Sequence, residues 1–224
     1  WNFLRIGQYI NRHYETRYNQ MKHRMECRKK GEDDFLMLDD MVSNSIWMEL
    51  NEAGYPCSVK NMENLIYSDF SFSYHPIREY MNHLPLWDGI DHIGRLAESV
   101  HTIPAQREFW LKGFRHFLVG MVAAATQEEV VNHLCLLLCS KQNLGKTTFI
   151  NKILSDDLRK DYLSTGIISA GNKDDLSRMA EFMLINFDEF EGMTGHELSL
   201  LKALITRKFI SIRLPYARHT LNLP

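Results

Sequence analysis

The sequence predicts an α/β core in its second half, preceded by a smaller, mainly helical α+β domain. Two observations predict the core. Residues 133–148 form an apolar run that breaks into a turn and ends in Gly145–Thr147, a Gly-Lys-Thr tripeptide. Residues 182–189 form a second apolar run, which closes on Asp188 and Glu189. Strands buried on both faces of a parallel sheet read as such runs, so the pair predicts an α/β P-loop NTPase core.

The first run has the parts of a phosphate-binding loop. Such a loop presents backbone N–H groups to the phosphates, a Lys to the terminal phosphates and a hydroxyl to Mg²⁺. Against the pattern G-x-x-x-x-G-K-[ST], Ser140 replaces the first Gly, and Asn143 fills a position often held by another. Asn accepts positive φ and Ser is small, so the loop can still close. The residues predicted to bind nucleotide are Ser140, Gln142, Asn143, Leu144, Gly145, Lys146, Thr147 and Thr148.

The second run supplies the acidic groups that this chemistry needs. Asp188 is expected at the end of a strand, where it holds Mg²⁺ together with Thr147, and Glu189 is expected to polarise the attacking water. The predicted catalytic residues are therefore Lys146, Asp188 and Glu189, and the predicted cofactors are ATP and Mg²⁺. Taken alone, either motif is also compatible with a solvated turn. Their order and spacing favour nucleotide binding. Asn186, inside the apolar run, needs a partner for its amide.

Composition fits one large or two small domains, with 224 residues of which 45% are hydrophobic. The formal net charge of −2 argues against a strongly basic protein that coats nucleic acid, while leaving room for a local basic groove. Four cysteines without a C-x-x-C pair indicate reduced thiols in a cytosol. No signal peptide or membrane span is recognisable, so a cytoplasmic location without membrane contact is expected. The missing initiator Met suggests a fragment of a longer chain.

Residues 1–84 are predicted to form the N-terminal α+β domain. Its expected elements are extended segments at Gln8–Tyr18 and Gln20–Arg28, a short strand at Phe35–Leu38, a helix capped by Asp39 or Asp40 that runs to Gly54, and a helix from Ser58 through Tyr67. Five basic residues cluster here: Lys22, Arg24, Arg28, Lys29 and Lys30. They fit either a contact with a nucleic-acid backbone or a solvated strand face.

Residues 85–105 are predicted to be a hinge region, and residues 106–224 the P-loop core. A helix is expected over Glu108–Ala125, with an apolar stripe of Phe109, Leu111, Phe114, Phe117, Leu118 and Met121. Thr194 and Glu197 match a capping box that begins another helix. Alternation over Phe209–Leu214 predicts an extended segment.

Several of these pieces together resemble the virulence-associated protein E family. They are Leu84–Gly89, Ser140–Phe149, Asp188-Glu189, Leu201–Arg207 and Pro215–Arg218. The resemblance covers at least Tyr74 to Pro224. It implies a P-loop ATPase similar to AAA+ proteins and superfamily 3 helicases of phages, mobile elements and bacterial genomes, often joined to primase domains. It also implies single-stranded DNA as partner, a ring-shaped homo-oligomer, and the cytoplasm of a bacterial or phage-infected cell.

The resemblance further implies a strand with a polar sensor residue between the two motif strands, encoded beyond Pro224. The AAA+-like core is therefore expected to be truncated before its sensor strand, and to lack an arginine finger. We expect an abnormal sheet, or a gap filled by Phe209–Leu214 or a neighbouring chain. A complete five-stranded core would contradict this expectation.

The function predicted is an ATP-binding and ATP-hydrolysing module of a DNA replication-associated protein, helicase-like or primase-associated, of a phage or mobile element. The alternative is a nucleotide-gated interaction module that binds ATP without significant turnover. A kinase is a weaker third, because no base for an acceptor site is recognisable.

Overall fold

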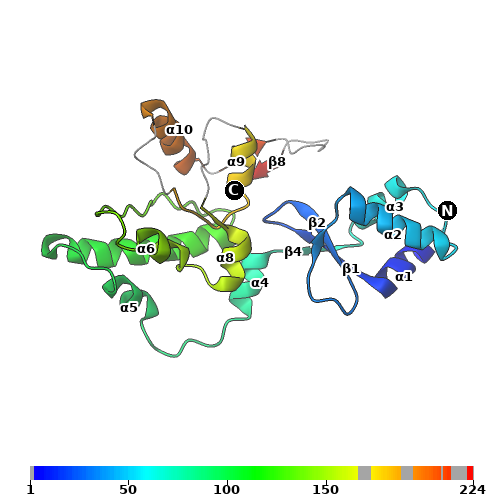
Figure 1. Cartoon of the computed structure of the whole chain (residues 1–224), viewed down its shortest axis with the longest axis horizontal. Coiled ribbons are helices and arrows are strands. Elements are labelled where there is room, and N and C mark those ends of the chain that lie inside the picture. The colour runs from blue at the N-terminus through cyan, green and yellow to red at the C-terminus, as the bar shows by residue number, and fades with distance from the viewer. Residues whose placement is uncertain (1–2, 166–172, 188–193, 208, 213–220, 224) are drawn as a thin grey trace. The chain divides into compact units, whose positions relative to one another are not determined.

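The computed structural model describes residues 3–165, 173–187, 194–207, 209–212 and 221–223. The chain has a mixed α/β fold and divides into two compact units, Trp1–Asn82 and His83–Pro224 (Figure 1). Each unit has its own sheet or sheets and is described by itself below. The predicted division into residues 1–84, 85–105 and 106–224 stays a prediction.

The N-terminal unit is built on a four-stranded sheet in the order β3-β2-β1-β4. β1 and β2 form an antiparallel hairpin with Tyr14 opposite Lys29, whereas β4 runs parallel to β1. The elements are α1 (Phe3–His13), β1 (Tyr14–Asn19), β2 (Arg24–Lys29), β3 (Leu36–Met37), α2 (Asp40–Glu52), α3 (Val59–Ile66), β4 (Phe72–Tyr74) and α4 (Pro76–Asn82).

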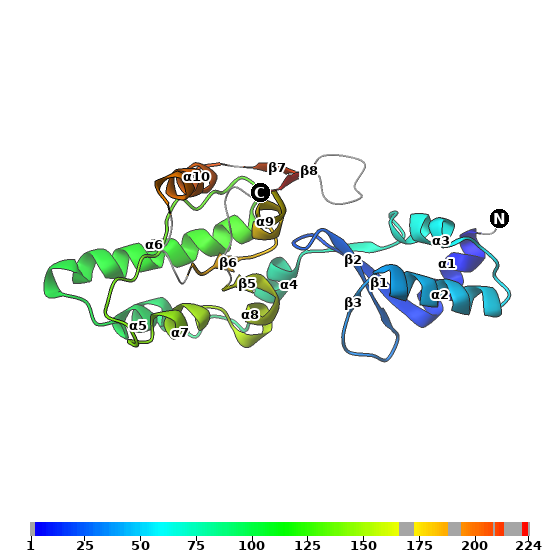
Figure 2. The same cartoon turned by 45° about the horizontal axis from the view of Figure 1, so that its top comes forward.

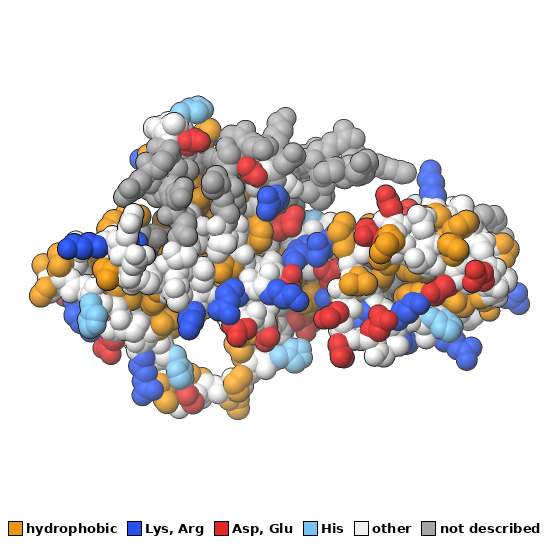
Figure 3. Space-filling view, in the orientation of Figure 1, with side chains coloured by type: hydrophobic (Ala, Val, Ile, Leu, Met, Phe, Trp, Pro, Cys, Tyr) orange, Lys and Arg blue, Asp and Glu red, His pale blue; other side chains and the backbone are white. Residues whose placement is uncertain are grey.

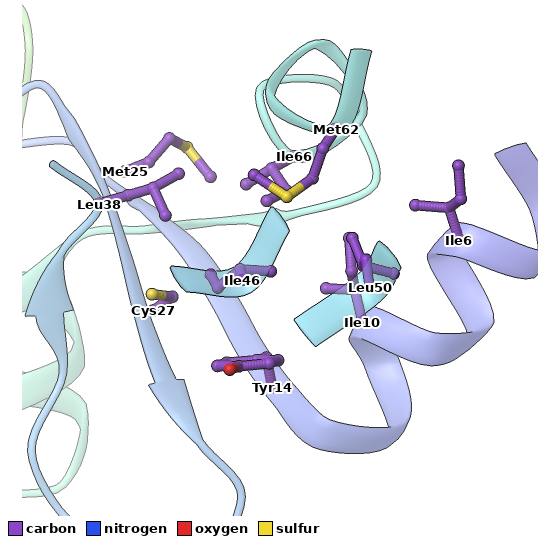
Figure 4. Packing of buried hydrophobic residues seen from close by; sticks show 10 residues of the cluster. All are labelled: Ile6, Ile10, Tyr14, Met25, Cys27, Leu38, Ile46, Leu50, Met62 and Ile66. Atoms are coloured by element: carbon purple, nitrogen blue, oxygen red, sulfur yellow. The ribbon is translucent and has the colours of Figure 1, made fainter. Parts of the chain in front are cut away.

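The core of this unit lies between one face of the sheet and helices α1, α2 and α3. Figure 4 shows its side chains pointing toward one another from these elements. Ile10 and Leu50 are fully buried, and Met25 and Cys27 face them from β2. At the edge of the core, the Tyr14 hydroxyl donates to the Glu49 carboxylate at 2.5 Å. Burial and the neighbouring Glu49 carboxylate raise the pKa of Tyr14, so the phenol stays a proton donor.

The prediction that Gln8–Tyr18 is one extended segment was wrong for its first half. Residues 3–13 form α1, and only Tyr14–Asn19 is a strand. Ile6 and Ile10 are one helical turn apart and both are buried, which fixes the segment as a helix. The second predicted segment, Gln20–Arg28, is a turn followed by β2. In α1, the burial of Ile6 and Ile10 in the core outweighs the preference of Tyr-rich sequence for strands.

Three other expectations for this unit are confirmed. β3 lies within the predicted Phe35–Leu38 strand. Asp39 caps α2 by accepting a hydrogen bond from the Val42 amide at 2.9 Å, and Ser58 caps α3 through the Asn61 amide. Both caps satisfy amides of a first helical turn that have no partner within the helix.

Replacing Asp39 by Ala is expected to lower the free energy of unfolding of the N-terminal unit by about 1 kcal/mol, because the Val42 amide loses its acceptor. Urea unfolding followed by circular dichroism measures the change. Asp40→Ala is the matched control, since Asp40 lies in the first turn but is not the cap. Equal losses in the two variants would contradict the capping role.

The second unit is mainly helical. Its elements are α5 (His92–Glu98), the 3₁₀ helix η1 (Pro104–Gln106), α6 (Arg107–Thr126), α7 (Lys146–Asn151), α8 (Asp156–Tyr162), β5 (Leu163–Ser164), α9 (Lys173–Met179), β6 (Leu184–Ile185), α10 (Gly195–Ile205), β7 (Ile210–Ile212) and β8 (Leu221–Leu223). Figure 2 shows α6 as its longest helix. The predicted hinge region, residues 85–105, contains α5 and the first two residues of η1.

Helix α6 confirms the prediction for Glu108–Ala125. Its buried residues are Phe114, Phe117 and Met121, one face of a 3.6-residue period. Phe109, predicted in the same stripe, is 81% exposed, so that part of the prediction was wrong. The period continues backward from Phe114 to Trp110 instead, and Phe109 lies one residue, or about 100°, off that face.

The predicted strand of the first apolar run is not formed. Residues 127–141 are described and contain no strand, and Leu137 is 67% exposed. Cys135 and Cys139, which lie in this run, are exposed. An apolar run favours burial, but a strand also needs a neighbour with which to pair. In the described part of this unit, β5 and β6 pair only with each other.

The second apolar run does form a strand, although a short one. β6 covers Leu184–Ile185 and runs parallel to β5. Of the extended segment predicted at Phe209–Leu214, Ile210–Ile212 is confirmed as β7, which among the described strands pairs with β8 and not with β5 or β6. Residues 213–214 lie outside the described residues. Within the described residues the unit thus has two two-stranded sheets, in line with the expected abnormal sheet and not with a gap filled by Phe209–Leu214. The P-loop NTPase core itself remains a prediction.

Candidate functional site

The loop of residues 140–148, called the 140–148 loop below, turns through two left-handed positions. Asn143 has φ of 62° and Gly145 has φ of 79°. Gly145 has open space where a side chain would lie, so its positive φ, and not crowding, is what favours Gly here. Asn is among the few other residues that adopt this conformation readily. The expectation that Asn143 tolerates positive φ is confirmed, and the turn leads directly into α7 at Lys146.

The ammonium group of Lys146 lies against the oxygens of its own loop. Nζ donates to the Ser140 carbonyl at 3.0 Å, the Ser140 hydroxyl at 3.1 Å and the Lys141 carbonyl at 3.0 Å. An ammonium has three donors, and these three oxygens match them. Oxygen acceptors of the same kind are offered by a phosphate. The Lys146 ammonium is therefore held among three oxygens of its own loop.

The other predicted binding residues lie along the same loop. Ser140, Gln142, Asn143, Leu144, Gly145 and Thr148 are exposed, and Lys146 and Thr147 are partly buried in the first turn of α7. The predicted metal and catalytic carboxylates, Asp188 and Glu189, lie outside the described residues.

A contact joins the helix after the loop to the strand before the two carboxylates. Asn186 is 4% exposed, and its side-chain amide donates to the Asn151 side-chain oxygen at 3.5 Å, a long hydrogen bond. Its backbone N–H donates to the Ser164 carbonyl at 2.8 Å. Asn151 ends α7, and Asn186 directly follows β6. The polar residue noted in the apolar run thus satisfies its amide by linking the two motifs.

An aromatic cluster anchors α7 on the rest of the unit. The Phe149 ring lies 5.7 Å from the Phe114 ring and 6.4 Å from the Trp110 ring, and Trp110 stacks on Phe114 at 5.0 Å. The Trp110 indole N–H donates to the Ala97 carbonyl of α5 at 2.8 Å. Sequence reasoning did not identify Trp110. Its spacing of four residues from Phe114 on α6 could have indicated that Trp110 lies on the same helix face.

The left-handed turn gives a test of the loop. Asn143→Val is expected to weaken ATP binding about ten-fold, because a β-branched residue resists the left-handed conformation by roughly 1–2 kcal/mol. Asn143→Gly is the control and should bind ATP at least as well as the unchanged chain. Calorimetric titration with Mg²⁺–ATP measures both affinities. If the Val variant binds as tightly as the Gly variant, this loop conformation is not the one that binds.

The described residues also bear on a metal site and a membrane span. Groups of three or more His, Cys, Asp or Glu side chains able to hold a metal do not occur among them. Nor does the described part of the chain contain a helix with the length and hydrophobicity needed to cross a membrane.

Comparison with known protein families identifies the second unit. The model of the virulence-associated protein E-like domain matches residues 81–224, which is more than half of the chain. The chain belongs to this family. The match to the virulence-associated protein E-like domain begins at Met81, beside the structural division at His83, and contains the whole of the 140–148 loop. A comparison with curated proteins gave no match.

Proposed function

We propose that this chain is the ATP-binding and ATP-hydrolysing module of a DNA replication-associated protein, helicase-like or primase-associated, of a phage or mobile element. The observation that carries the proposal is the 140–148 loop, with left-handed Asn143 and Gly145 and the Lys146 ammonium among loop oxygens. Membership of the virulence-associated protein E-like family supports the choice of reaction and of DNA as partner.

The residues of the loop fit ATP with Mg²⁺ by their chemistry. Lys146 exchanges the Ser140 and Lys141 oxygens for phosphate oxygens, which keeps all three ammonium donors satisfied. The Thr147 hydroxyl and Asp188 would hold Mg²⁺, which would supply positive charge to offset that of the phosphates. Hard oxygen ligands of this kind are those Mg²⁺ prefers.

In hydrolysis, Glu189 orients and polarises the attacking water, and Lys146 stabilises the charge that develops on the terminal phosphate. An Arg from a neighbouring subunit completes this stabilisation. The Asn186–Asn151 hydrogen bond supports the assignment, since it joins the strand leading to Asp188 and Glu189 to the helix that carries Lys146 and Thr147.

A nucleotide-gated interaction module is the second candidate, and one contact favours it. The Ser140 hydroxyl accepts from Lys146, a bond that the usual Gly at this position cannot make. This hydrogen bond stabilises the nucleotide-free loop, which slows the replacement of the loop oxygens by phosphate oxygens around Lys146. In that case ATP binding changes the loop and its partners, with little turnover.

The rate of ATP hydrolysis by the purified protein, with and without single-stranded DNA, tests the proposal. The motor function predicts turnover that single-stranded DNA stimulates. Hydrolysis that DNA leaves unchanged would contradict it. Glu189→Gln separates the two candidates: a motor loses turnover and retains bound ATP, whereas a binding module behaves almost as before.

A further inference from the structure

The sheet of the N-terminal unit has a second face, opposite the helices, with its own set of side chains. Residues directly opposite each other in neighbouring strands project from the same face. Arg17 is opposite Glu26 and Phe72, Glu26 is opposite Met37, and Asn19 is opposite Tyr74. We call this the open face, and its residues are Glu15, Arg17, Asn19, Arg24, Glu26, Arg28, Met37, Phe72 and Tyr74.

Aromatic rings and guanidinium groups form layers on the open face. The Arg17 guanidinium lies 3.6 Å from the centre of the Phe35 ring and 4.0 Å from that of the Tyr74 ring. It also pairs with Glu26 at 2.8 Å. These contacts hold Arg17 and Tyr74 in fixed positions. Phe72, opposite Arg17 on β4, is 58% exposed and presents a ring to solvent.

The charge on this face is uneven. The buried Glu26 accepts hydrogen bonds from Arg17 at 2.9 Å and from Asn19 at 2.9 Å, so its charge is already matched. Arg24 makes looser contacts, with Nε 3.6 Å from Glu26 and a terminal nitrogen 3.9 Å from the Met37 sulfur. Arg24 therefore has guanidinium donors left for a ligand.

Basic residues outnumber acidic ones in the hairpin that carries the open face. Residues 14–30 contain six Lys or Arg and two Glu, although the whole chain has a net charge of −2. Figure 3 shows basic and acidic side chains side by side on the surface. Beyond Arg28, whose guanidinium donates to the Asp33 carbonyl at 3.1 Å, comes the acidic run 32–34. Arg28 is already paired with Glu15 at 2.7 Å and is followed by this acidic run, so Arg24 is the more favourable contact for an anionic chain.

We propose that the open face binds single-stranded DNA, with a base stacked on Phe72 and a neighbouring phosphate on Arg24. Exposed aromatic rings beside guanidinium groups suit single-stranded DNA, because every base can stack on a ring and every backbone phosphate carries a negative charge. The choice of DNA as ligand rests on the proposed function. The choice of the open face as binding surface rests on the contacts within the N-terminal unit. Nucleotide binding at the 140–148 loop is not required.

Fluorescence anisotropy of a labelled 20-nucleotide oligothymidine with the full chain tests this proposal. Phe72→Ala is expected to weaken binding about ten-fold. The matched control is Tyr67→Ala, an aromatic residue that is also 58% exposed but ends α3. Arg24→Ala should weaken binding several-fold and lower the dependence of affinity on salt, whereas Lys60→Ala on α3 should not.

Unchanged affinity in both Phe72→Ala and Arg24→Ala, or no binding by the unchanged chain, would overturn the proposal. So would tighter binding of duplex DNA or of oligouridine than of oligothymidine. The titrations are made without ATP, so that a failure of the nucleotide site would leave their result unchanged and the two proposals can fail separately. Circular dichroism of each variant confirms that the fold is kept.

Discussion

Lys146→Ala is expected to weaken the binding of Mg²⁺–ATP by roughly 100-fold. The variant loses the Lys146 ammonium, which lies among oxygens of the 140–148 loop and would donate to phosphate oxygens instead. Hydrogen bonds to charged groups contribute about 1.5–3 kcal/mol each. Calorimetric titration of the variant and of the unchanged chain measures the loss directly.

Lys141→Ala is the matched control for this prediction. It removes the same charge from the same loop, but Lys141 contributes its backbone carbonyl to the Lys146 contact and not its side chain. A change of less than about three-fold is expected, in the range of exposed charges. Equal losses in both variants would mean that ATP senses only the overall charge of the loop.

The largest effect on stability is expected from Leu50→Ala in the N-terminal unit. Leu50 is fully buried between α2 and the rest of the core, beside Ile10 and Ile46 (Figure 4). Truncating a buried Leu removes apolar contacts and leaves a cavity, at a cost of about 2–5 kcal/mol. Hydrogen exchange of the α1, α2 and α3 amides in increasing urea measures this loss for the N-terminal unit alone.

Met48→Ala serves as the control, because Met48 is on the same helix and exposed. Its effect should stay within about 0.5 kcal/mol. If Leu50→Ala costs no more than Met48→Ala, the buried cluster does not stabilise this unit as described.

Sequence reasoning predicted best those features that depend on neighbours within three or four residues. The caps at Asp39 and Ser58 and the capping box of Thr194 with Glu197 were all found where predicted. In each, a side-chain oxygen satisfies an amide two or three residues along the chain. The left-handed conformation of Asn143 was predictable for the same reason, since it is a property of the residue type.

Features that depend on distant partners were predicted less well. The apolar run at 134–139 suggested a buried strand, but nothing in its own residues supplies a neighbouring strand. Helix α1 was taken as a strand because the burial of Ile6 and Ile10 depends on α2 and α3. The anchoring of Phe149 by Trp110 joins residues 39 positions apart, and the distance between their rings became known only with the fold.

The candidate site was predicted in part. The contact of Asn186 with Asn151 brings the strand before the carboxylates to the helix after the loop, whereas nucleotide binding by the loop residues stays a prediction. Asp188 and Glu189 themselves lie outside the described residues, so their roles stay predictions.

A crystal structure of the chain with Mg²⁺ and a non-hydrolysable ATP analogue tests the central claim most directly. We predict that Lys146 Nζ leaves the Ser140 and Lys141 oxygens and lies within hydrogen-bonding distance of the terminal phosphates, with Asn143 and Gly145 still left-handed. An analogue bound elsewhere, with Lys146 still held by Ser140, would contradict the account.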